Sequence, residues 1–233
     1  MGVKFHMKKI NLFILYLLLL LSSSLTSAQM KTSVTDVNSL VECYNAVRDS
    51  STFDNQKNYF DAFPATFAEF KDVFGYKGTK IIDATFGELY EESLEYITEF
   101  FHLNEVIDPY DFSNKIINLC INGEWQADGV NHLQTNVINI VTSDINHDCY
   151  YNHFDVFCCY SDTLRETLLS CLAQYSNNEI LSFWQFYLDG VPIIPINEGL
   201  YNRTRCLVIK YPVLVEQLDK AYFLSARKSE IIN

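Results

Sequence analysis

Apolar residues recur at steps of three and four along most of the chain, which is the spacing that gathers them on one face of an α-helix. The stripes lie at residues 34–47, 67–74, 89–103, 116–121, 130–141, 164–175, 180–188 and 211–222. Short connections separate them, with no linker rich in Pro, Gly or Ser. The pattern predicts an all-α fold, either a single-domain multi-helix bundle or a short α-solenoid-like array of about eight helices.

Polar residues that can accept hydrogen bonds from first-turn N–H groups mark the expected helix starts. Thr66 and Glu69 have the capping-box form, and Gly75 supplies the stop that follows. The other expected starts are Ser33, Ser113, Asp128, Thr163 and Asn178. Residues 76–87 are expected to form a loop with a short extended piece, and the apolar run 207–209 fits either a strand or a helix.

The first 28 residues predict a secretory signal peptide. A basic Met7-Lys8-Lys9 head precedes an apolar run that ends near Leu21, and small residues follow up to Ala28. The run is shorter than the ~20 residues that a membrane-spanning helix needs, although a retained anchor is the alternative. Translation starts at Met1 or Met7. We expect residues 1–28 to be cleaved and 29–233 to form one helical domain, periplasmic or secreted, without stable membrane insertion.

The chain is acidic, with 29 Asp and Glu against 17 Lys and Arg and a net charge of −12. Binding to nucleic acid or to an anionic membrane needs clustered basic residues, so these partners are not expected. A basic protein partner fits the charge better. Aromatic residues make up 15% of the chain, which argues against disorder.

Glutamates cover one side of the helix expected at 89–103 and form the best candidate for a partner-binding surface. They are Glu88, Glu91, Glu92, Glu95 and Glu99. Opposite charge would speed encounter with a basic partner. The alternative is a solvated helix face. Helical spacing places Trp184 in the core. His132 lies off the apolar stripe at 130–141 and is expected to be exposed.

One segment has the spacing of a calcium-binding loop. Its candidate ligands are Asp144, Asn146, Asp148, Asn152 and Asp155, at positions 1, 3, 5, 9 and 12 of a twelve-residue loop. The match has defects, because Cys149 stands where glycine normally makes the turn. A polar loop is the alternative, and no cofactor other than calcium is suggested. His147, Cys149 and His153 offer a further, transition-metal reading of the same segment.

The number of cysteines and the absence of catalytic motifs limit the classes of function that this chain can have. All seven cysteines follow the expected signal peptide, and an odd number leaves at least one thiol free or paired between chains. No phosphate loop, nucleophile elbow or dinucleotide fingerprint is present. We expect a binding or neutralising module for a basic partner, such as a toxin or cationic enzyme. The alternatives are a hydrolase or metal-binding enzyme using the carboxylates of Asp144–Asp155, and a structural envelope protein.

Several short patterns between residues 63 and 190 resemble a group of uncharacterised exported bacterial proteins. They are Phe63-Pro64 with Phe74-Gly75-Tyr76, Tyr96-Ile97 with Phe100-Phe101, Asn122-Gly123 with Trp125, and Ser182-Phe183-Trp184 with Asp189-Gly190. The resemblance implies a helical protein of the periplasm or the medium. It implies no activity and no functional residues.

Overall fold

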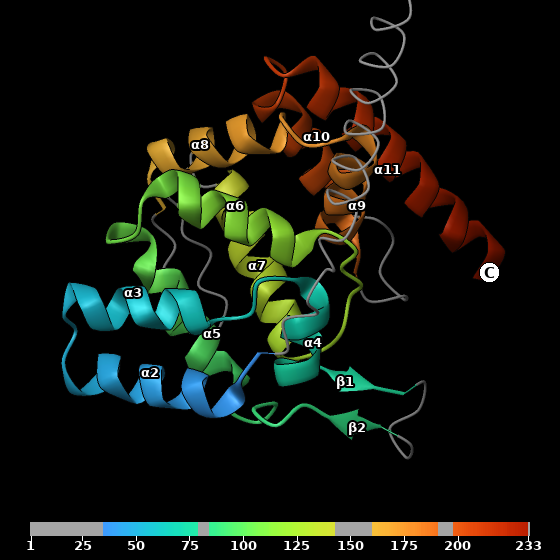
Figure 1. Ribbon diagram of the computed structural model, residues 1–233. Coiled ribbons are helices and arrows are strands. Elements are labelled where there is room, and N and C mark those ends of the chain that lie inside the picture. Colours follow the sequence, from blue (N-terminus) through green and yellow to red (C-terminus); the bar gives the residue numbers. More distant parts are fainter. Residues whose placement is uncertain (1–34, 79–83, 143–159, 191–197, 233) are drawn as a thin grey trace, which may run out of the picture. The chain divides into compact units, whose positions relative to one another are not determined.

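The all-α prediction is confirmed by the computed structural model, which describes residues 35–78, 84–142, 160–190 and 198–232 (Figure 1). These residues form ten α-helices, one 3-10 turn and a two-stranded hairpin. The helices are α2 (Val37–Asp49), α3 (Phe53–Ala62), α4 (Phe67–Phe74), α5 (Ser93–His102), α6 (Pro109–Cys120), α7 (Gly129–Thr142), α8 (Asp162–Leu172), α9 (Asn177–Leu188), α10 (Glu198–Leu207) and α11 (Pro212–Ile232). The 3-10 turn η2 (Leu103–Glu105) follows α5 directly.

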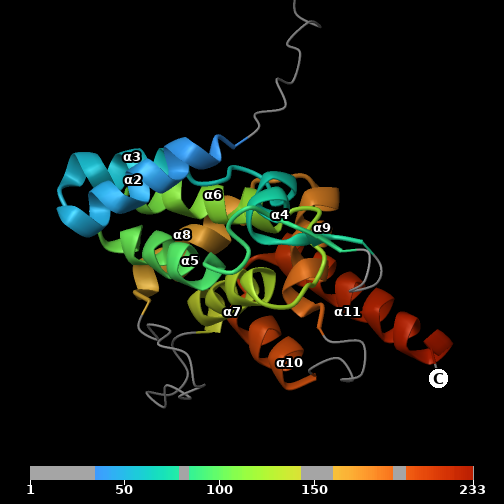
Figure 2. The ribbon, with the colours of Figure 1, turned by 90° about the horizontal axis from the view of Figure 1, so that it is seen from below.

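The hairpin is small and antiparallel. Strand β1 (Tyr76–Lys77) pairs with β2 (Thr85–Phe86), and Tyr76 lies opposite Phe86. Among the helices, α2 packs on α3, α5 on α7, α6 on α8, and α9 on α11. Figures 1 and 2 show α2 and α3 side by side in both views. None of the helices described here is both long and apolar enough to cross a membrane.

Phenylalanines from four helices, one of them at the residue that ends α3, form the interior between α3, α4, α5 and α6. We call them the phenylalanine cluster: Phe60, Phe63, Phe74, Phe100 and Phe112. Phe63 and Phe100 stack with ring centroids 4.1 Å apart, and Phe100 and Phe112 lie 5.2 Å apart. Trp184 of α9 is fully buried, as expected. The ring centroids of Phe67 in α4 and Phe186 in α9 are 5.6 Å apart, so these two helices contact each other within the same core.

Helix α6 begins before the expected cap. Asp108 accepts hydrogen bonds from the N–H groups of Tyr110 and Asp111, and Pro109 occupies the first helical position, where its missing N–H costs nothing. Ser113, the expected cap, is buried inside the helix. The Asp-Pro pair therefore starts this helix, five residues before the expected cap.

Three other helix starts also differ from expectation. Asp36 caps α2, whereas Ser33 lies outside the described residues. Ser161 caps α8 in place of Thr163, and Ser176 caps α9 through a reciprocal capping box with Glu179. In each case a neighbouring residue that can also accept the hydrogen bond starts the helix. The expected cap Thr66, the stop at Gly75 and the start of α7 after Asp128 are confirmed.

Two helices had no predicted counterpart. Helix α3 has only two buried residues, Tyr59 and Phe60, and α10 has only Thr204. A helix with so few apolar positions gives no three-and-four stripe to recognise. The run at 207–209 ends α10 and begins a turn.

His132 is buried, which corrects the expectation that it is exposed. Its side chain is 8% exposed, and its Nε2 lies 3.0 Å from the Thr98 hydroxyl. Burial lowers the pKa of His132 below its ordinary value. Four cysteines are described (Cys43, Cys120, Cys171 and Cys206), and each is a free thiol. Burial raises the pKa of Cys120 and Cys171, which disfavours the thiolate form of both side chains.

Candidate partner-binding surface

The predicted calcium loop lies outside the described residues. Its candidate ligands are Asp144, Asn146, Asp148, Asn152 and Asp155. Both the calcium reading and the transition-metal reading therefore stay predictions, as does the signal peptide. Within the part of the chain that the structure describes, no group of three or more His, Cys, Asp or Glu residues could hold a metal ion.

The predicted glutamate stripe divides between a turn and a helix. Because α5 begins only at Ser93, Glu88 and Glu91 lie in the preceding turn and Glu92 is the residue just before the helix. The expected helix start at Leu89 is therefore wrong by about one turn. All three glutamates are exposed.

Backbone contacts to α4 explain why the helix begins late. The N–H of Leu89 donates to the Val73 carbonyl at 3.1 Å, and that of Gly87 donates to the Gly75 carbonyl at 2.8 Å. The Leu89 side chain is buried. A Cβ on Gly87 would lie 2.2 Å from the Val73 carbonyl oxygen, so only glycine permits this close approach. The turn is thus fixed to the end of α4, and its glutamates project from a constrained backbone.

The two glutamates on α5 already have neighbours. The Tyr44 hydroxyl of α2 donates to Glu95 at 3.4 Å, and the Tyr44 ring stacks on Tyr96 at 4.1 Å. The Glu99 side chain is only 18% exposed, with its Oε2 3.9 Å from the Nδ1 of His102. Glu95 therefore helps to hold α5 against α2 although it is exposed, and Glu99 is the only glutamate of the predicted stripe that is partly buried.

Three aromatic side chains gather beside the turn. With two carboxylates they form what we call the Tyr90 face: Tyr76, Phe86, Tyr90, Glu91 and Asp128 (hairpin and its surroundings in Figure 1). The Phe86 and Tyr90 ring centroids are 4.6 Å apart, and Tyr76 lies 6.1 Å from Phe86 and 6.4 Å from Tyr90. Phe86 is 49% exposed, so apolar ring surface reaches solvent here.

Carboxylates surround the Tyr90 ring. The Tyr90 hydroxyl donates to Asp128, whose backbone has a φ of +56° just before α7. This hydrogen bond, followed by partial burial and the charges of Asp128 and Glu91, raises the pKa of Tyr90 to about 12. The lysine of β1, Lys77, is paired with Asp72 at 2.7 Å. The Tyr90 face therefore presents aromatic rings and negative charge together, an arrangement suited to Lys and Arg side chains.

A second candidate site is a pocket of about 550 Å³ along the outer side of α8, which we call the α8 pocket. Its lining comes from α6, α8 and the turn between α10 and α11. The residues are Tyr110, Asp162, Thr163, Glu166, Thr167, Ser170, Cys171 and Tyr211.

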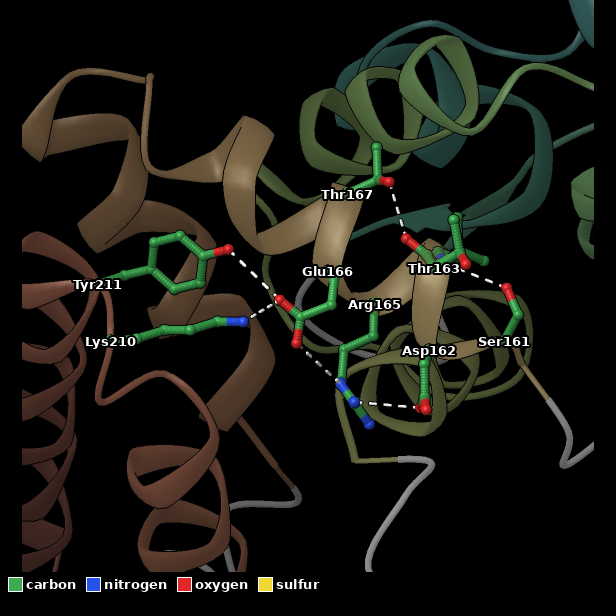
Figure 3. A network of polar contacts seen from close by, with 9 residues as sticks. Ser161, Asp162, Thr163, Arg165, Glu166, Thr167, Lys210 and Tyr211 are labelled. Carbon is green, nitrogen blue, oxygen red and sulfur yellow. Dashed lines mark hydrogen bonds and ion pairs between the residues drawn. The ribbon is translucent and has the colours of Figure 1, made fainter.

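Figure 3 shows the charged groups at this pocket. Glu166 accepts hydrogen bonds from the Lys210 ammonium and, at 3.5 Å, from the Tyr211 hydroxyl. The Arg165 guanidinium lies 3.9 Å from Glu166 and 3.1 Å from Asp162. Among the residues that the structure describes, two carboxylates thus face two cations at this pocket, unlike at the Tyr90 face.

No protein-family model, curated protein or solved structure matches this chain. The two sites must therefore be interpreted from their own residues. Sequence reasoning found the glutamates of the turn but missed Phe86 and the two residues that come to Tyr90 from farther along the chain, Tyr76 and Asp128. It also missed the α8 pocket. The capping-type run at 161–170, with polar residues repeated at helical spacing, is the only sequence signal for that site.

Proposed function

We propose that the protein acts by binding rather than by catalysis, and that it captures a basic protein partner through the Tyr90 face. The observation that carries this proposal is the exposed Phe86 ring, packed on Tyr90 beside the carboxylates of Glu91 and Asp128. Aromatic side chains anchor interfaces, and nearby carboxylates favour Lys and Arg in the partner. The net charge of −12 would speed the encounter.

The proposed setting is the periplasm or the medium, reached through the N-terminal signal peptide. An exported acidic protein with a rigid, glycine-fixed turn could escort or neutralise a cationic enzyme or toxin there. Glu88 and Glu92 flank the Tyr90 face in the chain, are exposed, and extend its negative charge.

The experiment is a pull-down of the tagged, exported protein from its own cell envelope, followed by mass spectrometry at low and moderate salt. We expect one basic protein to be enriched and then lost as salt rises, because screening weakens exposed charge pairs. In a triple variant with Glu88, Glu91 and Glu92 each changed to Lys, recovery of that protein should fall at least about tenfold.

The matched control changes Glu42, Glu105 and Glu216 to Lys. These three glutamates are also exposed, lie on other elements, and produce the same change of net charge. The proposal requires this control to lose much less partner than the turn variant. Equal losses would indicate a nonspecific charge effect, and an unchanged recovery in the turn variant would exclude the Tyr90 face.

A further inference from the structure

The α8 pocket has an oxygen-rich lining that neither the sequence predictions nor the partner-binding proposal accounts for. We infer that it binds a neutral saccharide. Apart from one buried thiol, its polar side chains are carboxylates, aliphatic hydroxyls and phenols, with no nitrogen donor in the lining itself. The volume of about 550 Å³ lies within the range of small-ligand sites, and the pocket is shallow and largely open to solvent.

A row of hydroxyls follows one side of α8. Thr163, Thr167 and Ser170 are four and three residues apart, so they are neighbours on the helix surface. The Thr167 hydroxyl donates to the Thr163 carbonyl at 2.7 Å, which leaves its oxygen lone pairs able to accept hydrogen bonds. These hydroxyls can both donate and accept hydrogen bonds, as sugar hydroxyls can. Each hydroxyl of the row can therefore pair with a hydroxyl of a polyol.

The carboxylates of the pocket are held in place before any ligand arrives. Glu166 is fixed by Lys210 and Tyr211, and Asp162 by Arg165 (Figure 3). A fixed carboxylate is a strong acceptor for a sugar hydroxyl. Because each carboxylate faces a cation, the pocket has little net charge with which to select an ion. This balance favours a neutral ligand over an ammonium or phosphate compound.

Two aromatic rings also line the pocket. Tyr110, at the start of α6, is 52% exposed, and Tyr211 precedes α11. Aromatic rings offer apolar surface at low conformational cost, and the C–H face of a pyranose ring packs against such surface. The hydroxyls and carboxylates of the pocket can hydrogen-bond the hydroxyls at the edge of a sugar, and the aromatic rings can pack against its face. Together these groups have the composition of a saccharide site.

The test is saturation-transfer-difference NMR of the full chain with cellobiose, maltose, lactose and N,N′-diacetylchitobiose. We expect at least one of these disaccharides to bind. Glu166→Gln should weaken that binding about tenfold, since a charged acceptor is lost. Thr167→Val, which keeps the side-chain shape, should weaken it about threefold. Circular dichroism checks that each variant is folded.

Two matched controls are available. Thr142→Val removes an equivalent hydroxyl, which donates to the Ile138 carbonyl at 2.8 Å on α7. Glu124→Gln removes a carboxylate paired with Lys71 outside the pocket. Both controls should bind as the wild type does. The inference is overturned if no disaccharide binds, or if pocket and control variants lose binding equally.

Salt distinguishes a saccharide from a charged ligand. Binding of a neutral disaccharide should be unchanged between about 50 mM and about 500 mM sodium chloride, because screening acts only on charge. A marked loss at high salt would overturn the assignment to a neutral sugar. The pull-down described above tests a different surface, so either proposal can fail without the other.

Discussion

The phenylalanine cluster and the Tyr90 face use the same kind of side chain in opposite ways. Phe63 and Phe100 stack at 4.1 Å with an interplanar angle of 13°, and both are almost completely buried. Phe86 and Tyr90 also touch, at 4.6 Å, but Phe86 is 49% exposed. Helices cover the first pair from several sides, whereas the second pair lies on a two-residue strand and the turn that follows it. Burial therefore decides whether a ring stabilises the fold or remains available to a partner.

The largest expected difference between the two regions is in stability. Phe100→Ala should reduce the free energy of unfolding by about 4 kcal/mol, because it leaves a cavity among closely packed rings. Phe100 contacts Phe63, Phe101 and Phe112, at 4.1 Å, 5.4 Å and 5.2 Å between centroids. Urea unfolding followed by circular dichroism measures the change. A loss below about 1 kcal/mol would mean that the cluster is not the stabilising core.

The two regions should also respond to pH with opposite sign. Beside the phenylalanine cluster, the Lys115 ammonium donates to the Phe60 carbonyl and lies 4.6 Å from the centre of its ring. Burial, only partly offset by the charge of Asp61, lowers the pKa of Lys115 to about 8. On the Tyr90 face, the hydrogen bond to Asp128 raises the pKa of Tyr90 to about 12.

Between pH 8 and its ordinary pKa of 10.5, Lys115 binds more protons in the unfolded state than in the folded one. Its contribution to stability therefore rises with pH in that window. Tyr90 contributes stability below pH 10 that is lost as pH rises towards 12. Urea unfolding of the wild type and of Lys115→Met, at about pH 7 and about pH 9.5, measures the contribution of the lysine to the pH dependence of stability. The free energy of unfolding of the wild type should increase relative to that of the variant at the higher pH. An unchanged difference between the two would contradict the lowered pKa of Lys115.

The buried region was more predictable from the sequence than the exposed one. The stripe at 130–141 predicted the buried apolar residues of α7, because burial of one face imposes a helical period on the sequence, but it did not predict the buried polar residues His132, Gln134 and Asn136. Helix ends were less certain. Ser113 and Thr163 have the right chemistry for caps, but Asp108 with Pro109, and Ser161, start those helices instead. Several neighbouring residues can accept the hydrogen bonds of a helix N-terminus, and only the tertiary fold determines which of them is the cap.

The candidate sites depend on contacts between distant residues, which periodicity does not report. Asp128 meets Tyr90 across 38 positions of the chain, and Lys210 meets Glu166 across 44. The glutamates of the turn were found because they cluster in sequence. Their separation from α5 was missed because it arises from the bonds of Gly87 and Leu89 to α4.

The smallest expected effect on stability is the sharpest test of the comparison. Phe86→Ala should change the free energy of unfolding by less than about 0.5 kcal/mol, because half of the side chain is already in water. Recovery of the basic partner in the pull-down should nevertheless fall about tenfold, since an aromatic anchor is removed. Phe53→Ala is the matched control, because Phe53 is 60% exposed on α3. If both variants retain the partner equally, exposed rings do not anchor it and the contrast between the two regions concerns stability alone.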